Sequence, residues 1–280
     1  MATRKTTEQC YDPSLEGTGM RSGGYRFSRV TIGALVKVLM RKVWSGMDNI
    51  PATGPVLLAV NHISYADPLN TALYVNNAGR QPRFLAKAEL LKVPGLRFLM
   101  NDTGQIPVYR ETREAGAALV NAVKRLEAGG CVVVYPEGTI TKDPEHWPMV
   151  ARTGIARLFL ATGAPVIPIS QWGAQELPGK WRPWRRVAVK MHAGPALDLS
   201  RFEGREPTPA LLDEITDLVM AAIRAGVSAQ RGEPAPSVVW DNRRKEHVPI
   251  EGRRPSAVGD SGRQDDVTQE QATKSRRKTA

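Results

Sequence analysis

The sequence predicts an α/β fold, a single domain with a central mixed β-sheet flanked by helices. Two observations carry this prediction. Between residues 55 and 225, short apolar runs rich in valine and isoleucine alternate with longer segments of helical periodicity. In addition, a chain of 280 residues with 41% apolar and 24% charged residues can bury one sizeable core. The two ends of the chain do not follow this alternation.

The N-terminal part is expected to hold a flexible segment followed by one helix. Residues 1–25 are polar and glycine-rich, and they lack the apolar run of a secretory signal. Residues 27–46 intersperse apolar side chains with Lys37, Arg41 and Lys42, which predicts a basic amphipathic helix. Such a helix would lie on a membrane surface or pack on the core, and both alternatives stay open. No uncharged run approaches the roughly 18 to 20 residues that a spanning helix needs.

Regular elements are predicted throughout residues 26–228, with the motifs concentrated in residues 50–195. The apolar runs predict six strands, at Val56–Val60, Arg83–Ala86, Gln105–Tyr109, Cys131–Tyr135, Val166–Ser170 and Val187–His192. The helical patterns cover Pro68–Val75, Arg113–Ala128, Thr153–Thr162 and a last helix from Thr208 and Pro209 to about Ala225. Strands that alternate with helices in this way predict a sheet covered on its faces.

Residues 229–280 are expected to form a disordered basic and polar tail, because they are rich in Arg, Glu, Pro, Ser, Gln and Asp and nearly free of aromatics. The whole chain has 39 Lys and Arg against 28 Asp and Glu, a formal charge of +11. From Gln230 onward there are 11 basic and 8 acidic residues, so the body itself keeps a charge of +8. This excess favours an anionic partner such as anionic lipid or a phosphorylated substrate. Nucleic acid is not expected, because the tail mixes both charges and lacks interleaved aromatics.

A histidine and an aspartate follow the first predicted strand, separated by four residues. On a continuous helix the side chains of His62 and Asp67 would point about 140° apart. They can meet only if the chain turns between them, as it does at a strand-to-helix junction where Asp67 caps the helix ahead of Pro68. His62 could then take a proton from an attacking hydroxyl while Asp67 orients its ring. The alternative is a structural histidine beside an ordinary helix cap.

Two further blocks combine a strand end with polar residues. Residues 104–110 form a strand that ends in Arg110, and a guanidinium there could grip a phosphate through paired hydrogen bonds or form a surface ion pair. Residues 134–142 lead from an apolar strand into a turn. In this turn Gly138 permits a close backbone approach, and Glu137 could accept from a hydroxyl of a substrate.

With the apolar strand at residues 165–170, these blocks resemble the glycerolipid acyltransferase family typified by 1-acyl-glycerol-3-phosphate acyltransferase, over about residues 50–195. The resemblance implies transfer of a fatty acyl group from acyl-CoA or acyl-carrier protein to the free hydroxyl of a lysophosphatidic acid-type lipid, in phospholipid biosynthesis. It implies that His62 is the general base and Asp67 its orienting partner. The stretch 135–172 is most similar to actinobacterial branches of the family.

The resemblance also implies five substrate-binding residues, which are Lys87, Arg110, Glu137, Gly138 and Thr139. Many members place Arg-Ser after the Pro-Glu-Gly-Thr block, whereas this chain has Ile140 and Thr141. Lys142 or Arg152 would then supply the second phosphate contact.

No metal and no cofactor beyond the acyl thioester co-substrate is implied. A covalent acyl-enzyme is not expected, because the chain has no Gly-x-Ser-x-Gly elbow and Cys131 lies in an apolar run where it should be buried and inert. The resemblance implies a peripheral protein at the cytoplasmic face of the cell membrane, in contact with a phospholipid surface. Three alternatives stay open: another acceptor such as glycerol-3-phosphate or a glycolipid, water as the acceptor, and a basic nucleic-acid-binding protein.

Overall fold

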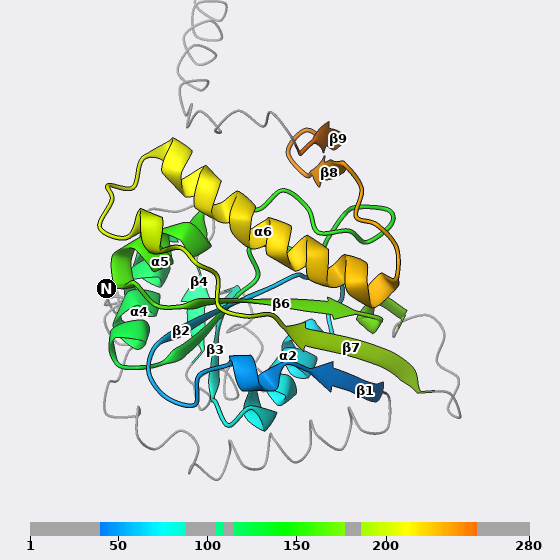
Figure 1. Ribbon diagram of the computed structural model, residues 1–280, viewed down its shortest axis with the longest axis horizontal. Coiled ribbons are helices and arrows are strands. Elements are labelled where there is room, and N and C mark those ends of the chain that lie inside the picture. Colours follow the sequence, from blue (N-terminus) through cyan, green and yellow to red (C-terminus); the bar gives the residue numbers. More distant parts are fainter. Residues whose placement is uncertain (1–39, 88–104, 109–114, 177–185, 251–280) are drawn as a thin grey trace, which may run out of the picture.

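The computed structural model describes residues 40–87, 105–108, 115–176 and 186–250. In this part of the chain a seven-stranded mixed sheet forms the centre of one α/β domain (Figure 1). Its strands are β1 (Met40–Ser45), β2 (Val56–Val60), β3 (Pro82–Lys87), β4 (Ile106–Val108), β5 (Cys131–Val134), β6 (Val166–Trp172) and β7 (Val187–Ala193). Their order across the sheet is β1-β7-β6-β2-β5-β3-β4. All neighbours are parallel except β6 and β7, which pair antiparallel.

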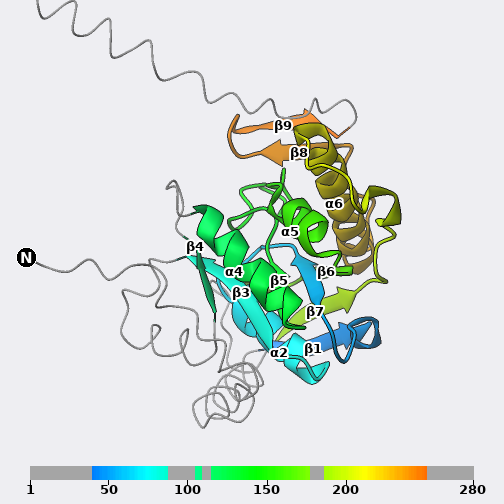
Figure 2. The same ribbon diagram turned by 90° about the vertical axis from the view of Figure 1, so that its left-hand side faces the viewer.

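Helices cover both faces of this sheet, as the sequence predicted (Figure 2). They are α2 (Asp67–Asn77), α4 (Ala115–Glu127), α5 (Gly154–Thr162) and α6 (Pro209–Arg231), with short 3-10 helices η3 (Met47–Asn49), η5 (Ala174–Glu176) and η6 (Ser200–Phe202). Leu57 and Ala59 of β2 belong to the core cluster formed with α4, α5 and α6. Leu58 and Val60 belong to the opposite cluster, which includes Tyr74 of α2. The continuous apolar run of β2 therefore reflects a strand buried on both faces.

All six predicted strands and all four predicted helices are present, with ends shifted by a few residues. The largest shift is at the end of α6, which continues to Arg231 instead of stopping near Ala225. Gly226 does not end the helix. The stop is Gly232, which adopts the left-handed conformation with φ of 77° and whose N–H bonds back to Ser228.

The prediction of a helix over residues 27–46 is wrong for residues 40–46, the part of it that the structure describes. Met40–Ser45 form strand β1, which pairs with β7 along its whole length. The apolar residues Met40, Val43 and Trp44 have helical spacing, but pairing with the edge of β7 decides for a strand. Residues 27–39 of this prediction lie outside the described residues.

The disorder predicted from residue 229 is wrong as far as residue 250. Val238–Asp241 (β8) and Glu246–Pro249 (β9) form an antiparallel hairpin. One side of it is covered, since Val239 and Val248 are buried. Residues 251–280 lie outside the described residues. Within the described ranges, no helix combines the length and apolar character needed to cross a membrane.

Gly226 marks the close approach of α6 to β6, and this contact can be tested. A Cβ at Gly226 would lie 2.6 Å from Ser170 Oγ and 2.8 Å from Ser170 Cβ, so Gly226→Ala must push α6 off the sheet. We expect it to lower the free energy of unfolding by about 1 to 3 kcal/mol, measured by urea denaturation. The control is Gly116→Ala in α4, where a Cβ meets nothing within 4 Å and no loss is expected. Equal stability of the two variants would contradict the prediction.

Candidate functional site

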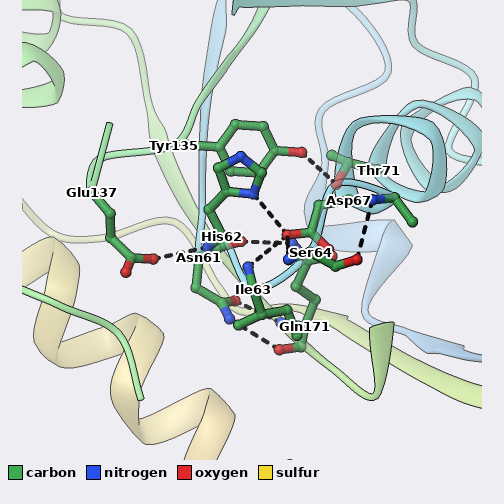
Figure 3. A network of polar contacts seen from close by, with 10 residues as sticks. Asn61, His62, Ile63, Ser64, Asp67, Thr71, Tyr135, Glu137 and Gln171 are labelled. Carbon is green, nitrogen blue, oxygen red and sulfur yellow. Dashed lines mark hydrogen bonds and ion pairs between the residues drawn. The ribbon is translucent and has the colours of Figure 1, made fainter. Parts of the chain in front are cut away.

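The turn between β2 and α2 brings His62 and Asp67 together (Figure 3). Nδ1 of His62 lies 2.8 Å from Oδ2 of Asp67. The same oxygen accepts hydrogen bonds from the backbone N–H groups of Ile63, at 2.6 Å, and Ser64, at 2.8 Å. The meeting of the two side chains, predicted from their spacing, is therefore present in the structure.

The predicted role of Asp67 as a helix cap is wrong in its detail. Asp67 is the first residue of α2, Ala66 occupies the cap position, and Pro68 is the second helical residue. The carboxylate accepts from the amides of the turn before the helix, not from those of the helix. This follows from the backward tilt of side chains along a helix, which points Asp67 toward the preceding residues.

Burial and hydrogen bonding act on Asp67 in opposite directions. The side chain is fully buried, and this burial raises the pKa of Asp67, whereas the His62 ring and the amides of Ser64 and Ile63 lower it. Oδ1 is buried without a hydrogen-bond partner among the described residues, so the stabilising contacts converge on Oδ2. The ionised form of Asp67 thus depends on its three donors.

The His62 ring is held in one orientation. Asp67 accepts from Nδ1, which leaves Nε2 as the nitrogen that can take up a proton. The ring stacks on Tyr135, with centroids 4.3 Å apart and planes at 22°. Tyr135 is itself fixed, because its hydroxyl donates to Oγ1 of Thr71 at 3.1 Å. With 16% of its side chain exposed, His62 keeps limited access to solvent.

The loop between β5 and α5, residues 135–153, holds the backbone of His62 from both sides. The His62 N–H donates to Oε1 of Glu137 at 2.8 Å. The His62 carbonyl accepts from the N–H of Thr141 at 2.7 Å. We refer to this segment as the β5–α5 loop.

Glu137 fits a positioning role better than the predicted contact with an acceptor hydroxyl. Its second oxygen accepts from the N–H of Met149 at 2.9 Å, so each carboxylate oxygen already holds a backbone amide. The residue is only 4% exposed. Burial raises the pKa of Glu137 to about 8, and the two amide donors oppose this shift. Burial outweighs the two donors, because this pKa still lies well above the ordinary value for a glutamate.

Sequence reasoning missed a pair of amide side chains that fixes the end of β2 to β6. Gln171 donates from its backbone N–H to Oδ1 of Asn61 at 2.8 Å and from Nε2 to the Asn61 carbonyl at 2.6 Å. Asn61 Nδ2 donates back to the Gln171 carbonyl at 3.0 Å. Both residues are fully buried and directly precede His62 and Trp172. The sequence did contain a signal for this pair, because an amide residue stands at the end of each of the two apolar strands.

Of the other predicted residues, the structure places Gly138 and Thr139 beside Glu137, partly exposed. Gly138 has φ of +71°, and a Cβ there would lie 3.1 Å from Nε of Arg152, so the Arg152 side chain covers this glycine. Lys87 is the last residue of β3 and pairs in register with Val108 of β4. Arg110 lies outside the described residues.

Cys131 is buried in β5, as predicted. It is 2% exposed, and burial raises the pKa of its thiol to about 12, which keeps it a poor nucleophile. Among the residues that the structure describes, no three His, Cys, Asp or Glu side chains gather as a metal site would require.

Comparisons with known proteins relate this chain to acyltransferases. An acyltransferase family model matches residues 42–172, which include His62, Asp67 and Glu137. The 1-acyl-sn-glycerol-3-phosphate acyltransferase of Borreliella burgdorferi is 27% identical over 200 residues, covering 68% of this chain and 78% of the relative. The enzyme of the same name from Helicobacter pylori is 31% identical over 96 residues, covering 34% of this chain and 39% of the relative.

A solved structure has the same fold. The crystal structure of PlsC, the 1-acyl-sn-glycerophosphate acyltransferase of Thermotoga maritima, matches with a TM-score of 0.59 and 23% identity, over 75% of this chain and 81% of that one. The family model spans the turn with His62 and Asp67 and the loop that holds it, and the likeness to one relative extends over two thirds of the chain. Residues 42–172 of this chain therefore match the acyltransferase family model, and the chain is similar to named acyltransferases.

Proposed function

We propose that this O-acyltransferase moves a fatty acyl group from acyl-CoA or acyl-carrier protein to the free hydroxyl of lysophosphatidic acid, in phospholipid biosynthesis. The observation that carries the proposal is the 2.8 Å contact of His62 Nδ1 with the buried Asp67, which leaves Nε2 as the basic nitrogen. The names of both relatives support the acceptor. The motif resemblance supports a thioester donor.

In this proposal His62 acts as a general base. Nε2 takes the proton of the acceptor hydroxyl while the oxygen of that hydroxyl attacks the thioester carbonyl carbon. The carbon–sulfur bond then breaks, and the imidazolium returns the proton to the departing thiolate. The positive charge on the ring is stabilised by the Asp67 carboxylate 2.8 Å away, and its burial limits screening by solvent and salt.

For the acceptor phosphate we propose Arg152 together with Arg110 and Lys87. Arg152 has structural support, because it is exposed, its side chain lies over Gly138, and its N–H donates to the Pro136 carbonyl at 2.9 Å. It thereby sits on the turn that contains Glu137. Arg110 and Lys87 rest on the motif resemblance alone, as do the acceptor contacts proposed for Gly138 and Thr139.

We also propose that the protein works as a peripheral protein at the cytoplasmic face of the cell membrane. The acceptor is a lipid, and the body of the chain carries a charge of +8 that favours an anionic surface. Arg41 and Lys42 on the edge strand β1 are exposed and contribute to this charge. We further propose residues 26–228 as the acyltransferase domain, extended by the last residues of α6 and by the hairpin to residue 250.

His62→Ala tests the base. We expect turnover of acyl-CoA to fall by about 10²-fold or more, with an unchanged circular dichroism spectrum, because the variant lacks the proposed proton acceptor. His192→Ala in β7 is the matched control and should keep turnover within about twofold. Turnover by His62→Ala within tenfold of wild type would exclude the proposed base.

Arg152→Ala tests the phosphate contact. Loss of a charge-assisted hydrogen bond should raise the KM for lysophosphatidic acid about tenfold, while the KM for monoacylglycerol, which lacks the phosphate, stays unchanged. Arg157→Ala, also exposed but on α5, should change neither constant. Equal changes for both acceptors would show that Arg152 does not contact the phosphate.

Dependence on the acceptor separates transfer from hydrolysis. If the hydroxyl acceptor is a lipid, release of CoA from acyl-CoA should require added lysophosphatidic acid, and each CoA released should match one molecule of diacylated product. A thiol assay and lipid chromatography measure the two quantities. CoA release at full rate without any acceptor would assign the protein to the hydrolases. A panel with glycerol-3-phosphate and a glycolipid identifies other acceptors.

A further inference from the structure

The C-terminal segment from Arg231 to residue 250 makes several contacts with the β5–α5 loop. The first comes from Arg231, whose guanidinium lies between the rings of Trp147, at 4.1 Å, and Trp172, at 4.3 Å. Nη1 of Arg231 donates to the carbonyl of Glu145 at 2.6 Å. The end of α6 is thereby fastened both to the loop and to the end of β6.

The hairpin β8–β9 adds two contacts to the same loop, and Figure 2 shows it beside α6. The Trp240 carbonyl in β8 accepts from the N–H of Val150 at 2.9 Å. His247 in β9 donates from Nε2 to Oδ2 of Asp143 at 2.8 Å. The Trp240 ring packs edge-on against His247, with centroids 5.2 Å apart and planes at 77°, which fixes the imidazole.

Asp143 connects His247 to other residues of the loop. It is 4% exposed, and its Oδ1 accepts from the N–H groups of Glu145, at 2.8 Å, and Trp147, at 3.3 Å. Its own N–H donates to Oγ1 of Thr141 at 3.2 Å, and that hydroxyl donates to the Trp147 carbonyl at 2.8 Å. Asp143 thus joins His247 to the residue whose N–H holds the His62 carbonyl.

Two continuous paths therefore lead from the hairpin to His62. One runs from His247 through Asp143 and Thr141 to the His62 carbonyl. The other runs from Trp240 through Val150 and its neighbour Met149 to Glu137, which accepts the His62 N–H. Every link is a hydrogen bond or a peptide bond between described residues.

We propose that the C-terminal hairpin is a positioning element of the active site and that His247 is its positioning residue. It holds the β5–α5 loop in the conformation that fixes the backbone of His62. A small displacement of a catalytic group lowers the rate of the chemical step more than the binding of substrate. The inference rests on the proposed function of His62, and it assigns a task to residues that the family match at 42–172 does not include.

The test uses three variants of the full chain. His247→Ala removes the donor to Asp143, and His247→Gln keeps a donating nitrogen on a side chain of similar reach. Glu246→Ala is the matched control, since Glu246 neighbours His247 in β9 and is likewise exposed. The measurements are kcat and KM with acyl-CoA and lysophosphatidic acid, and the hydrogen exchange of backbone amides in residues 137–150.

We expect His247→Ala to lower kcat about three- to tenfold while both KM values change less than about twofold. His247→Gln should restore kcat to within about twofold of wild type, and Glu246→Ala should leave it unchanged. The amides of residues 137–150 should exchange faster in His247→Ala than in Glu246→Ala.

Wild-type kcat in His247→Ala would overturn the inference, and so would an equal fall in His247→Gln or in Glu246→Ala. If the wild-type protein shows no acceptor-dependent turnover, the proposed function fails instead. In that case hydrogen exchange still tests whether the hairpin holds the β5–α5 loop. Unchanged exchange in His247→Ala would show that the hairpin does not hold the loop, and faster exchange would support the contact.

Discussion

Oδ2 of Asp67 accepts three hydrogen bonds, from the His62 ring and from the amides of Ile63 and Ser64, and the geometry of the site depends on them. Burial by itself drives this carboxyl toward its neutral form, in which it would lose much of its hold on the imidazole. The two amides are available only because the chain turns tightly between strand and helix. The turn that brings His62 and Asp67 together therefore also supplies the amides that stabilise the Asp67 carboxylate.

The sheet explains why residues from three strands converge at this turn. β2, β5 and β6 run parallel, so their carboxyl ends meet at one edge of the sheet. His62 follows β2, Tyr135 and Glu137 follow β5, and Gln171 lies near the end of β6. In open α/β sheets this edge is where ligands bind. Tyr135 stacks on the His62 ring and Glu137 binds the His62 backbone. Gln171 binds the preceding residue, Asn61.

The β5–α5 loop links this site to the rest of the protein. It contributes Glu137 and Thr141 to the backbone of His62, and on its other side it is held by α6 and by the hairpin. The family match ends at residue 172, before α6 begins. Support for the turn with His62 and Asp67 is thus drawn partly from elements that the family match does not include.

The sequence by itself determined the central strands and the helices, because buried strands read as continuous apolar runs and helices as amphipathic ones. It also determined the meeting of His62 and Asp67, since a turn of four residues leaves the chain few ways to fold. Only the tertiary structure decided β1 and the hairpin, whose short strands form against an existing edge or surface. It alone paired Glu137 with His62, 75 residues apart, and His247 with Asp143, 104 residues apart. Such partners follow from how strands and loops pack, and no local pattern encodes that.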